Sequence, residues 1–298
     1  MRIFVTGATG FIGSAVVQNL LGAGHQIVGL SRSDAAADAL TSVGASVHRG
    51  SLEDLDSLRA GASAADGVIH LGFIHDFSRF AENCEIDRHA ITALGSALAG
   101  SNRPLVVTSG IGLLPQGRIA TEDSAPAGQN PRVASEEAAR AVAGRGVAVS
   151  IVRLPPSVHG DGDHGFVPIL ITLARDTGVS AYVDGGDNRW TAVHRLDAAR
   201  LFRLAIEKAE PEAVYHGVAE QGIAFREIAE AIGRRLGLPV VSRTKEQAAA
   251  HFGWFAHFAA LDVPASSAHT RDALGWRPTQ AGLLEDLERP SYFPTPGR

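Results

Sequence analysis

Cysteine, tyrosine and long apolar runs are scarce in this 298-residue chain. The single cysteine, Cys84, excludes an intramolecular disulfide, and we expect it to be a small buried side chain rather than a nucleophile. The 12 histidines lack paired cysteines and a zinc-type spacing, so no metal site is predicted. Glycine, proline or charge interrupts every apolar stretch before the roughly 20 residues that a bilayer-spanning helix needs.

An excess of charge of either sign is also missing. The formal net charge is −5 and the basic residues are scattered, so neither nucleic acid nor an anionic membrane is expected as a partner. The residues after Met1 have the pattern of a strand rather than a signal segment, which favours a cytoplasmic protein. An apolar content of 45% is enough for one large or two smaller buried cores.

Apolar strand-like segments alternate with segments of helical periodicity over the first half of the chain. This alternation predicts a parallel sheet covered on both faces, a Rossmann-type doubly wound α/β fold with its ligand at the carboxyl ends of the strands. The expected strands are 2–7, 25–30, 45–50, 67–72, 104–110 and 147–154. The expected helices are 14–24, 37–44, 52–61 with Ser51 as N-cap, 82–100 and one led by 130–140.

The pattern becomes less regular after residues 155–165. We expect a nucleotide-binding domain over 1–155 and a smaller α+β substrate-binding region over 156–298, with some later segments returning to pack on the first domain. No glycine-serine or charged hinge marks the junction. The segments of this half with element-like patterns are 168–178, 180–186, 196–209, 213–220 and 225–237.

The stretch TGATGFIG, residues 6–13, places three glycines on a strand-to-helix turn. Glycine lets the backbone approach a pyrophosphate, whose charge the helix N-terminus then stabilises. A tight turn that only needs conformational freedom is the alternative, but the flanking strand and helix favour a dinucleotide site. Its candidate contacts are Gly7, Thr9, Gly10, Phe11, Ile12 and Gly13.

The second strand ends in LSRSD, with Arg32 where an NAD-binding protein usually carries an acidic residue. A guanidinium can hold a 2′-phosphate through two parallel hydrogen bonds, and Ser31 and Ser33 could add donors. These residues favour NADP(H) as the cofactor. Two alternatives stay open: Arg32 as an ordinary exposed side chain, and Asp34 as a ligand of the same ribose.

Further motifs follow in order along nearly the whole chain: RGSLED (49–54), HLG (70–72), VVTSG (106–110), RLPPSVHGDGD (153–163), GGDNRWTAVHRLDAAR (185–200) and SSAHTRDALGWRP (266–278). Together with the glycine turn they resemble the extended short-chain dehydrogenase/reductase family, which includes NAD-dependent epimerases and dehydratases. The resemblance implies further cofactor contacts from Ser51, Leu52, Leu71, Gly72, Phe73, Thr108, Pro155, Ser157 and Val158.

The chain departs from this family at the catalytic groups. The family binds a substrate carbonyl with Ser or Thr and protonates it with the Tyr of a Tyr-x-x-x-Lys pair. Here Arg132 aligns with that Tyr and Glu136 with the Lys, which indicates an atypical subgroup. The catalytic Ser aligns with Ser109 or Gly110, and Asp87 replaces an Asn. All tyrosines lie far downstream: Tyr182, Tyr215 and Tyr292.

Several residues could replace the tyrosine: Ser109, His159, Arg132, and His75 or Asp76. Histidine, with an ordinary pKa of about 6.5, can donate a proton, whereas arginine can stabilise an anion but hardly titrates. We prefer His159, because its motif covers the nicotinamide in the family. Each candidate also has a structural alternative: caps or packing for Ser109, Asp76 and the histidines, and a surface pair for Arg132 and Glu136. Asp87 is expected to link its helix to the site.

These residues predict an NADPH-dependent reductase acting on a C=O, or less readily a C=C or C=N, of a small, rather apolar substrate. The competing hypotheses are a cofactor-binding sensor that has lost catalysis and a nucleotide-sugar epimerase or dehydratase, whose chemistry depends most on the Tyr base. A homodimer is a candidate assembly, and residues 251–261 could form a lid or a subunit contact. Candidate cleft aromatics are Phe73, Phe77, Phe80, Phe166, Trp190, Trp254 and Phe258.

Overall fold

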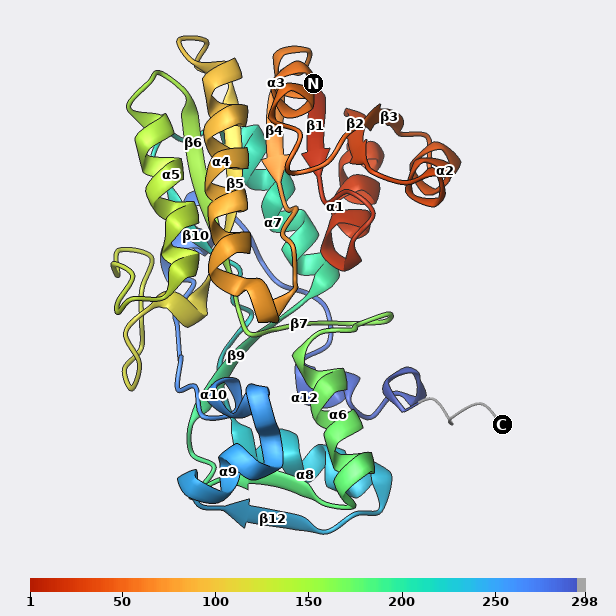
Figure 1. The fold of residues 1–298 in the computed structure, drawn as a ribbon, viewed down its shortest axis with the longest axis vertical. Coiled ribbons are helices and arrows are strands. Elements are labelled where there is room, and N and C mark those ends of the chain that lie inside the picture. Colours follow the sequence, from red (N-terminus) through yellow and green to blue (C-terminus); the bar gives the residue numbers. More distant parts are fainter. Residues whose placement is uncertain (294–298) are drawn as a thin grey trace.

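The computed structural model describes residues 1–293, which form two lobes (Figure 1). The first lobe contains a seven-stranded, all-parallel sheet of order β10-β6-β5-β4-β1-β2-β3. This confirms the predicted parallel sheet, to which a seventh strand from the second half of the chain is added. The strands are β1 (Arg2–Thr6), β2 (Gln26–Ser31), β3 (Ser46–Arg49), β4 (Gly67–His70), β5 (Pro104–Gly110), β6 (Ala148–Leu154) and β10 (Val214–His216).

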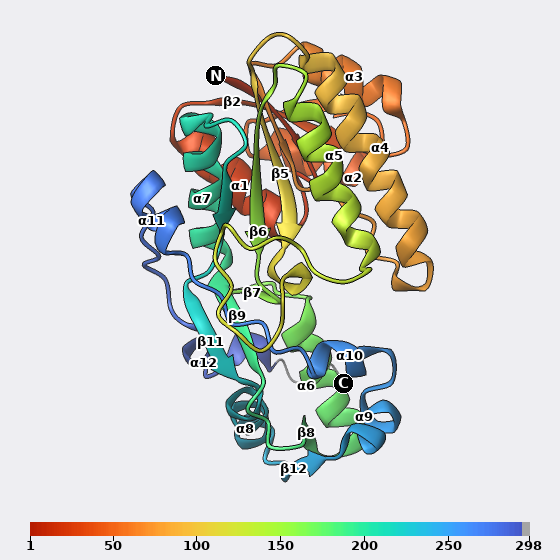
Figure 2. The ribbon, with the colours of Figure 1, turned by 90° about the vertical axis from the view of Figure 1, so that its left-hand side faces the viewer.

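Helices cover both faces of this sheet because its central strands are apolar on both sides (Figure 2). One layer consists of α1 (Phe11–Gly22), α2 (Asp34–Ser42) and α7 (Arg195–Lys208). The opposite layer consists of α3 (Leu55–Ser63), α4 (Phe80–Leu98) and α5 (Ala134–Ala143). Residues 195–216, which contain α7 and β10, thus return from the second lobe and complete the first.

Two helix starts differ from the expectation. Helix α3 begins at Leu55, because the Asp54 carboxylate accepts the Ser57 N–H at 3.0 Å, so the predicted Ser51 cap is wrong. The segment 130–140 is divided between a 3₁₀ turn, η3 (Pro131–Val133), and α5. Asn130 caps that turn by accepting the N–H of Arg132 at 3.0 Å.

The second lobe contains two small sheets and short helices. Its strands are β7 (Ser157–His159), β9 (Arg189–His194) and β11 (Glu220–Ala224) in one sheet, with β8 (Ser180–Val183) and β12 (Val240–Arg243) in the other. Its helices are α6 (Phe166–Thr177), α8 (Phe225–Leu236), α9 (Lys245–Phe252), α10 (Ala256–Ala259) and α12 (Leu283–Asp286). Helix α11 (Ala268–Leu274) packs instead on the first lobe, against β10 and α7 (Figure 2). The remaining 3₁₀ turns are η1 (Phe77–Arg79), η2 (Ile111–Leu113), η4 (Gly253–Phe255) and η5 (Pro290–Tyr292).

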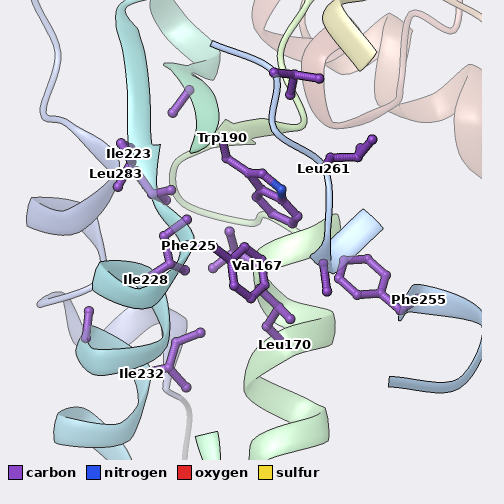
Figure 3. Packing of buried hydrophobic residues seen from close by; sticks show 14 of the residues in the cluster. Val167, Leu170, Trp190, Ile223, Phe225, Ile228, Ile232, Phe255, Leu261 and Leu283 are labelled. Atoms are coloured by element: carbon purple, nitrogen blue, oxygen red, sulfur yellow. The ribbon is translucent and has the colours of Figure 1, made fainter. Parts of the chain in front are cut away.

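Trp190 lies at the centre of the second lobe's core rather than on a cleft wall (Figure 3). Its indole is fully buried and meets the Phe225 ring edge-on, with the ring centroids 5.0 Å apart. Its Nε1 donates to the carbonyl of Phe258 at 3.2 Å. The prediction of Trp190 as a cleft residue is therefore wrong.

Within residues 1–293, no helix is both long and apolar enough to cross a membrane, and no cluster of potential metal ligands occurs.

Candidate active site

The glycine turn joins β1 to α1 at the carboxyl edge of the sheet, which faces the second lobe (Figure 1). Gly7 has a φ of +66° and lies so close to the backbone of Gly72 that a Cβ would be 2.7 Å from its nitrogen. A Cβ at Gly13 would overlap the carbonyl oxygen of Gly7. Only glycine fits these positions, so the turn keeps its backbone open to a close ligand.

The start of α1 supplies the donors of an anion site. The backbone N–H of Ser14 donates the first intrahelical hydrogen bond, to the carbonyl of Gly10 at 2.9 Å. The N–H groups that come before it in the first turn have no acceptor within the helix. Gly10 carries no capping side chain and the first turn contains no acidic residue. This cradle fits a pyrophosphate group.

The end of β2 lies where the adenosine ribose of a dinucleotide would bind. The hydroxyl of Ser31 donates to the Ser33 carbonyl at 2.8 Å, and Ser33 caps α2 by accepting the Ala36 N–H at 3.3 Å. Arg32 is exposed and has no hydrogen bond or ion pair with another described residue. Asp34 instead pairs with Arg49, at the end of β3, at 2.7 Å. Two guanidinium groups therefore border this edge, and the carboxylate there has a partner.

Asp87, on α4, is the hub of a buried polar network at the ends of β1, β4 and β5. Its carboxylate accepts from Arg132 Nη1 at 2.6 Å, from Ser135 Oγ at 2.5 Å and from His70 Nε2 at 3.0 Å. Burial alone would raise the pKa of Asp87, but the charge of Arg132 and the hydrogen bond from His70 outweigh it and lower that pKa. Asp87 is therefore an ionised buried group.

His70 continues this network to the first strand. Gly72 N–H donates to Thr6 Oγ1 at 3.1 Å, and Thr6 Oγ1 lies 2.8 Å from His70 Nδ1. His70 thus links the Asp87 carboxylate to Thr6 and, through Thr6, to the backbone that follows β4.

Arg132 occupies the space between the ends of β4 and β5. Besides its ion pair with Asp87, its guanidinium contacts Ser135 Oγ and donates to the carbonyl of Thr108 at 3.3 Å. Its Cζ lies 4.2 Å from the centroid of the Phe73 ring, within range of a cation–π interaction. The Arg132 side chain keeps 16% of its surface exposed, against 1% for Asp87, so this cation is anchored yet accessible.

Glu136 does not pair with Arg132, so the alternative of a surface pair between them is wrong. Its side chain is fully buried and binds Arg153 through two hydrogen bonds of 2.8 and 2.9 Å, with Arg140 at 2.8 Å. Ser109 Oγ donates to the same carboxylate at 2.8 Å. Burial opposes ionisation, but the hydrogen bonds and charge of Arg153 lower the pKa of Glu136. An ionised acid thus lies where the resemblance implied a Lys, and it accepts a hydrogen bond from the Ser109 hydroxyl.

His159 is fully buried, and the structure contradicts its placement as an accessible proton donor. Its Nδ1 lies 2.6 Å from Asp286 on α12, and its ring meets that of His194 edge-on at 5.4 Å. Burial lowers the pKa of His159, although Asp286 opposes this shift. Side chains alternate along a strand, so Ser157 and His159 point into the protein while Val158 points the other way.

The loop after β4 carries the remaining donor candidates and meets the second lobe. Asp76 caps η1, accepting from the Ser78 N–H at 3.0 Å and hydroxyl at 2.6 Å. The rings of Phe73 and Phe77 flank His75, and this partial cover, together with the charge of Arg132, lowers its pKa, although the residue stays exposed to solvent. Phe77 stacks on Trp254 with ring centroids 5.1 Å apart, so residues 251–261 contact the loop that follows β4.

Most of the predicted cofactor residues lie along this one edge of the sheet. They follow β1 (Gly7, Thr9, Gly10, Phe11, Ile12, Gly13), β2 (Arg32, Ser33), β3 (Ser51, Leu52), β4 (Leu71, Gly72, Phe73) and β6 (Pro155), or lie near strand ends (Ser31, Thr108, Val158). Two of these residues, Ser31 and Ser157, have buried side chains.

Sequence reasoning missed four partners: Thr6, His70, Ser135 and Arg153. A usable signal existed for Arg153, because a charged residue within an apolar strand needs a buried counter-ion. His70 likewise ends an apolar strand, but nothing local identifies Asp87 as its partner.

Three comparisons place these features among known proteins. Residues 3–110 match the model of the NAD dependent epimerase/dehydratase family. An uncharacterized protein of Schizosaccharomyces pombe is 50% identical over 98% of this chain and 100% of its own length. A 4-hydroxy-2-methyl-3-oxo-4-farnesyl-3,4-dihydroquinoline-1-oxide ketoreductase of Stigmatella aurantiaca is 27% identical over 72% of this chain and 67% of its own.

The fold also has solved counterparts. The dTDP-glucose 4,6-dehydratase DesIV of Streptomyces venezuelae, solved with NAD and TYD bound, superimposes with a TM-score of 0.76 at 21% identity. The superposition covers 97% of this chain and 96% of the dehydratase chain. Both lobes therefore share the architecture of that enzyme.

Proposed function

The chain belongs to the NAD-dependent epimerase/dehydratase family, and from this premise we propose that it is an NADP(H)-dependent oxidoreductase. The proposed reaction is hydride transfer to or from the carbonyl carbon of a small, rather apolar compound. One observation carries this proposal: Arg132, anchored by the buried Asp87, holds an accessible guanidinium at the position that aligns with the family's Tyr. A fixed cation stabilises the oxyanion that forms as a carbonyl gains hydride.

The dinucleotide would be held along the carboxyl edge of the sheet. The glycine turn and the first N–H groups of α1 would bind its pyrophosphate, and residues 71–73 and Thr108 would lie beside its nicotinamide half. When bound, the nicotinamide supplies or accepts the hydride. The protein's own part is to hold the carbonyl beside Arg132.

The proton requires a separate source, because the candidate donors among the described residues are neutral or already engaged in hydrogen bonds. The pKa of His75 is lowered by burial and by Arg132, and that of His159 by burial, so both rings are mainly neutral at pH 7. The Ser109 hydroxyl already donates a hydrogen bond to Glu136. We therefore assign oxyanion stabilisation to Arg132 and proton delivery to solvent water.

The preference for NADP(H) rests on the edge after β2. Arg32 lacks a partner among the described residues. Arg49, on the neighbouring strand, forms an ion pair with Asp34, so that carboxylate is not left unpaired. A 2′-phosphate would be attracted by both guanidinium groups. Arg32→Ala should therefore weaken NADPH binding more than NADH binding; equal losses for the two cofactors would contradict the preference.

The proposed substrate class follows from the aromatic side chains beside Arg132. Phe73 lies against its guanidinium, and Phe77 and Trp254 stack at the contact between the lobes. These rings favour an apolar or aromatic carbonyl compound over a nucleotide sugar, whose diphosphate needs a basic cluster. The ketoreductase name of the Stigmatella relative agrees with this choice.

Purified protein can be tested by following NADPH absorbance with a panel of aldehydes, ketones and quinones, and NADP with the matching alcohols. Turnover of apolar carbonyls that falls in Arg132→Ala supports the proposal. Tight NADPH binding without turnover of any compound would overturn it in favour of a cofactor-binding sensor. The engagement of Ser109 by Glu136 is the observation that favours this second candidate.

A further inference from the structure

Arg195, the first residue of α7, lies beside the start of α1. The two helices pack with their N-termini at the same edge: Arg195 Nη2 lies 3.3 Å from Ser14 Oγ, and Arg203 Nε lies 2.8 Å from Asn19 Oδ1. Because Ser14 belongs to the first turn of α1, the Arg195 guanidinium borders the helix end that follows the glycine turn.

The guanidinium also joins the glycine turn to residues 160–165. Its Cζ lies 4.7 Å from the ring centroid of Phe11, and its Nη1 donates to the carbonyl of Asp161 at 2.8 Å. The Phe11 ring also meets His164 edge-on at 5.7 Å. A Cβ at Gly160 would lie 2.7 Å from His194 Nε2, so this close approach of the loop to α7 depends on glycine.

No carboxylate neutralises this cation. Among residues 1–293, Arg195 forms no ion pair, and its Nε atom is buried without a hydrogen-bond partner. An unpaired cation next to a helix N-terminus adds to the positive potential there, where an anion is the favourable counter-ion. Its hydrogen bonds inside the protein go to neutral oxygens only.

We propose that Arg195 is a cofactor-binding residue, whose guanidinium holds the pyrophosphate of the dinucleotide and fastens residues 160–165 beside it. This assignment rests on the proposed cofactor site and extends it to a residue outside the glycine turn. The negative charge of the pyrophosphate would complete the hydrogen bonding that Arg195 leaves open.

The chain offers a matched control on the same helix. Arg203 also bridges α7 to α1, through Asn19, and pairs with Glu207 at 3.1 Å. Its guanidinium borders the far part of α1, away from the glycine turn. If Arg195 served only to pack α7 on α1, Arg195→Ala and Arg203→Ala would have equal effects on cofactor binding.

The test is titration of the full chain with NADPH, which contains the pyrophosphate, and with adenosine 2′-monophosphate, which lacks it. Arg195→Ala should weaken NADPH binding about 10- to 100-fold, the range of a hydrogen bond to a charged group. Arg195→Lys should recover part of this loss. Binding of adenosine 2′-monophosphate should stay within about 2-fold of the parent protein, as should NADPH binding by Arg203→Ala.

Equal NADPH affinities of Arg195→Ala and the parent protein would overturn the assignment, as would equal losses in Arg195→Ala and Arg203→Ala. A parallel loss for adenosine 2′-monophosphate would do the same, because it would indicate general damage to the site. Failure of the parent protein to bind any dinucleotide would instead refute the cofactor site itself. The melting temperature of each variant checks that it folds.

Discussion

Two buried carboxylates, Asp87 on α4 and Glu136 on α5, each hold an arginine, but the two ion pairs differ in access. Arg132 keeps part of its side chain exposed beside Asp87, whereas Arg153 and Glu136 are both enclosed. An enclosed pair can serve the fold alone, since no substrate reaches it. The accessible pair presents a charge to the cleft, and its buried member fixes the position of that charge. Equivalent chemistry thus serves stability in one pair and the proposed catalysis in the other.

Removing the enclosed acid should have the largest effect. Glu136→Ala leaves Arg153 buried without its counter-ion, which should lower the free energy of unfolding by about 3–5 kcal/mol in a urea titration. Glu137→Ala is the control on the same helix, because that exposed acid pairs, among residues 1–293, with Arg88 alone, and exposed pairs contribute about 0–1 kcal/mol. Similar losses in the two variants would erase the distinction between the enclosed pair and a surface pair.

Removing the accessible cation should reduce activity and also stability, because the buried Asp87 loses its counter-ion. Arg132→Ala should lower kcat about 10²- to 10³-fold, the effect of deleting an oxyanion-stabilising group, while Asp87 retains His70 and Ser135. Arg140→Ala is the control, because Glu136 keeps Arg153 when this half-exposed arginine is removed. A kcat near that of the parent protein in Arg132→Ala would remove Arg132 from the mechanism.

Acid should lower the stability in two pH ranges, first through the buried histidines and then through the two carboxylates. Burial lowers the pKa of His216, which lies 3.4 Å from Arg153, to about 4. The unfolded state then binds the proton first, so stability should fall from about pH 6.5 and level off near pH 4, on the order of 3 kcal/mol for this group. The lowered pKa values of His159 and His194 act in the same direction. His216→Asn should reduce this phase of the urea midpoint, and an unchanged pH profile would argue against it.

The two carboxylates should act at lower pH. The folded-state pKa values of Asp87 and Glu136 are both lowered, so their contributions are complete above the ordinary carboxyl range of about 4. They are lost as the pH falls through the folded-state values. Glu136→Gln should flatten the fall in the urea midpoint below about pH 4. A slope equal to that of the parent protein would show that Glu136 is not ionised.

The smallest effect should come from the aromatic contact between the lobes. Trp254→Ala removes the stack on Phe77 and should cost about 0.5–1.5 kcal/mol of stability, because Trp254 is already 56% exposed. It should raise KM for apolar carbonyls with little change in kcat, and Trp254→Phe should restore most of the affinity. A large fall in kcat would instead place this residue with Arg132.

The sequence predicted the first six strands and the glycine turn well, because buried parallel strands are continuous apolar runs and the turn lies within eight residues. It did not identify β10 as the seventh strand of the same sheet. That strand has three residues and lies in the sheet only because it pairs with β6, far earlier in the chain.

The candidate site was predicted in its cofactor part and less well in its catalytic part. Resemblance located His159 in a loop over the nicotinamide, but strand alternation turns its ring into the protein. The spacing of Arg132 and Glu136 allowed a mutual surface pair as an alternative, yet α4 and β6 each supply a closer partner. These outcomes depend on which neighbours cover a face, and local spacing contains no record of those neighbours.

By itself, then, the sequence determined the parallel sheet and the anion-binding turn, along with the absence of a Tyr-x-x-x-Lys pair. Each depends on residue types at fixed short spacings, through backbone freedom and strand or helix periodicity. Only the tertiary structure decided that Arg132 is anchored and accessible while Glu136 is enclosed. Ion-pair partners are chosen by distance in space, and Asp87 reaches Arg132 across 45 positions of the chain because α4 packs against α5.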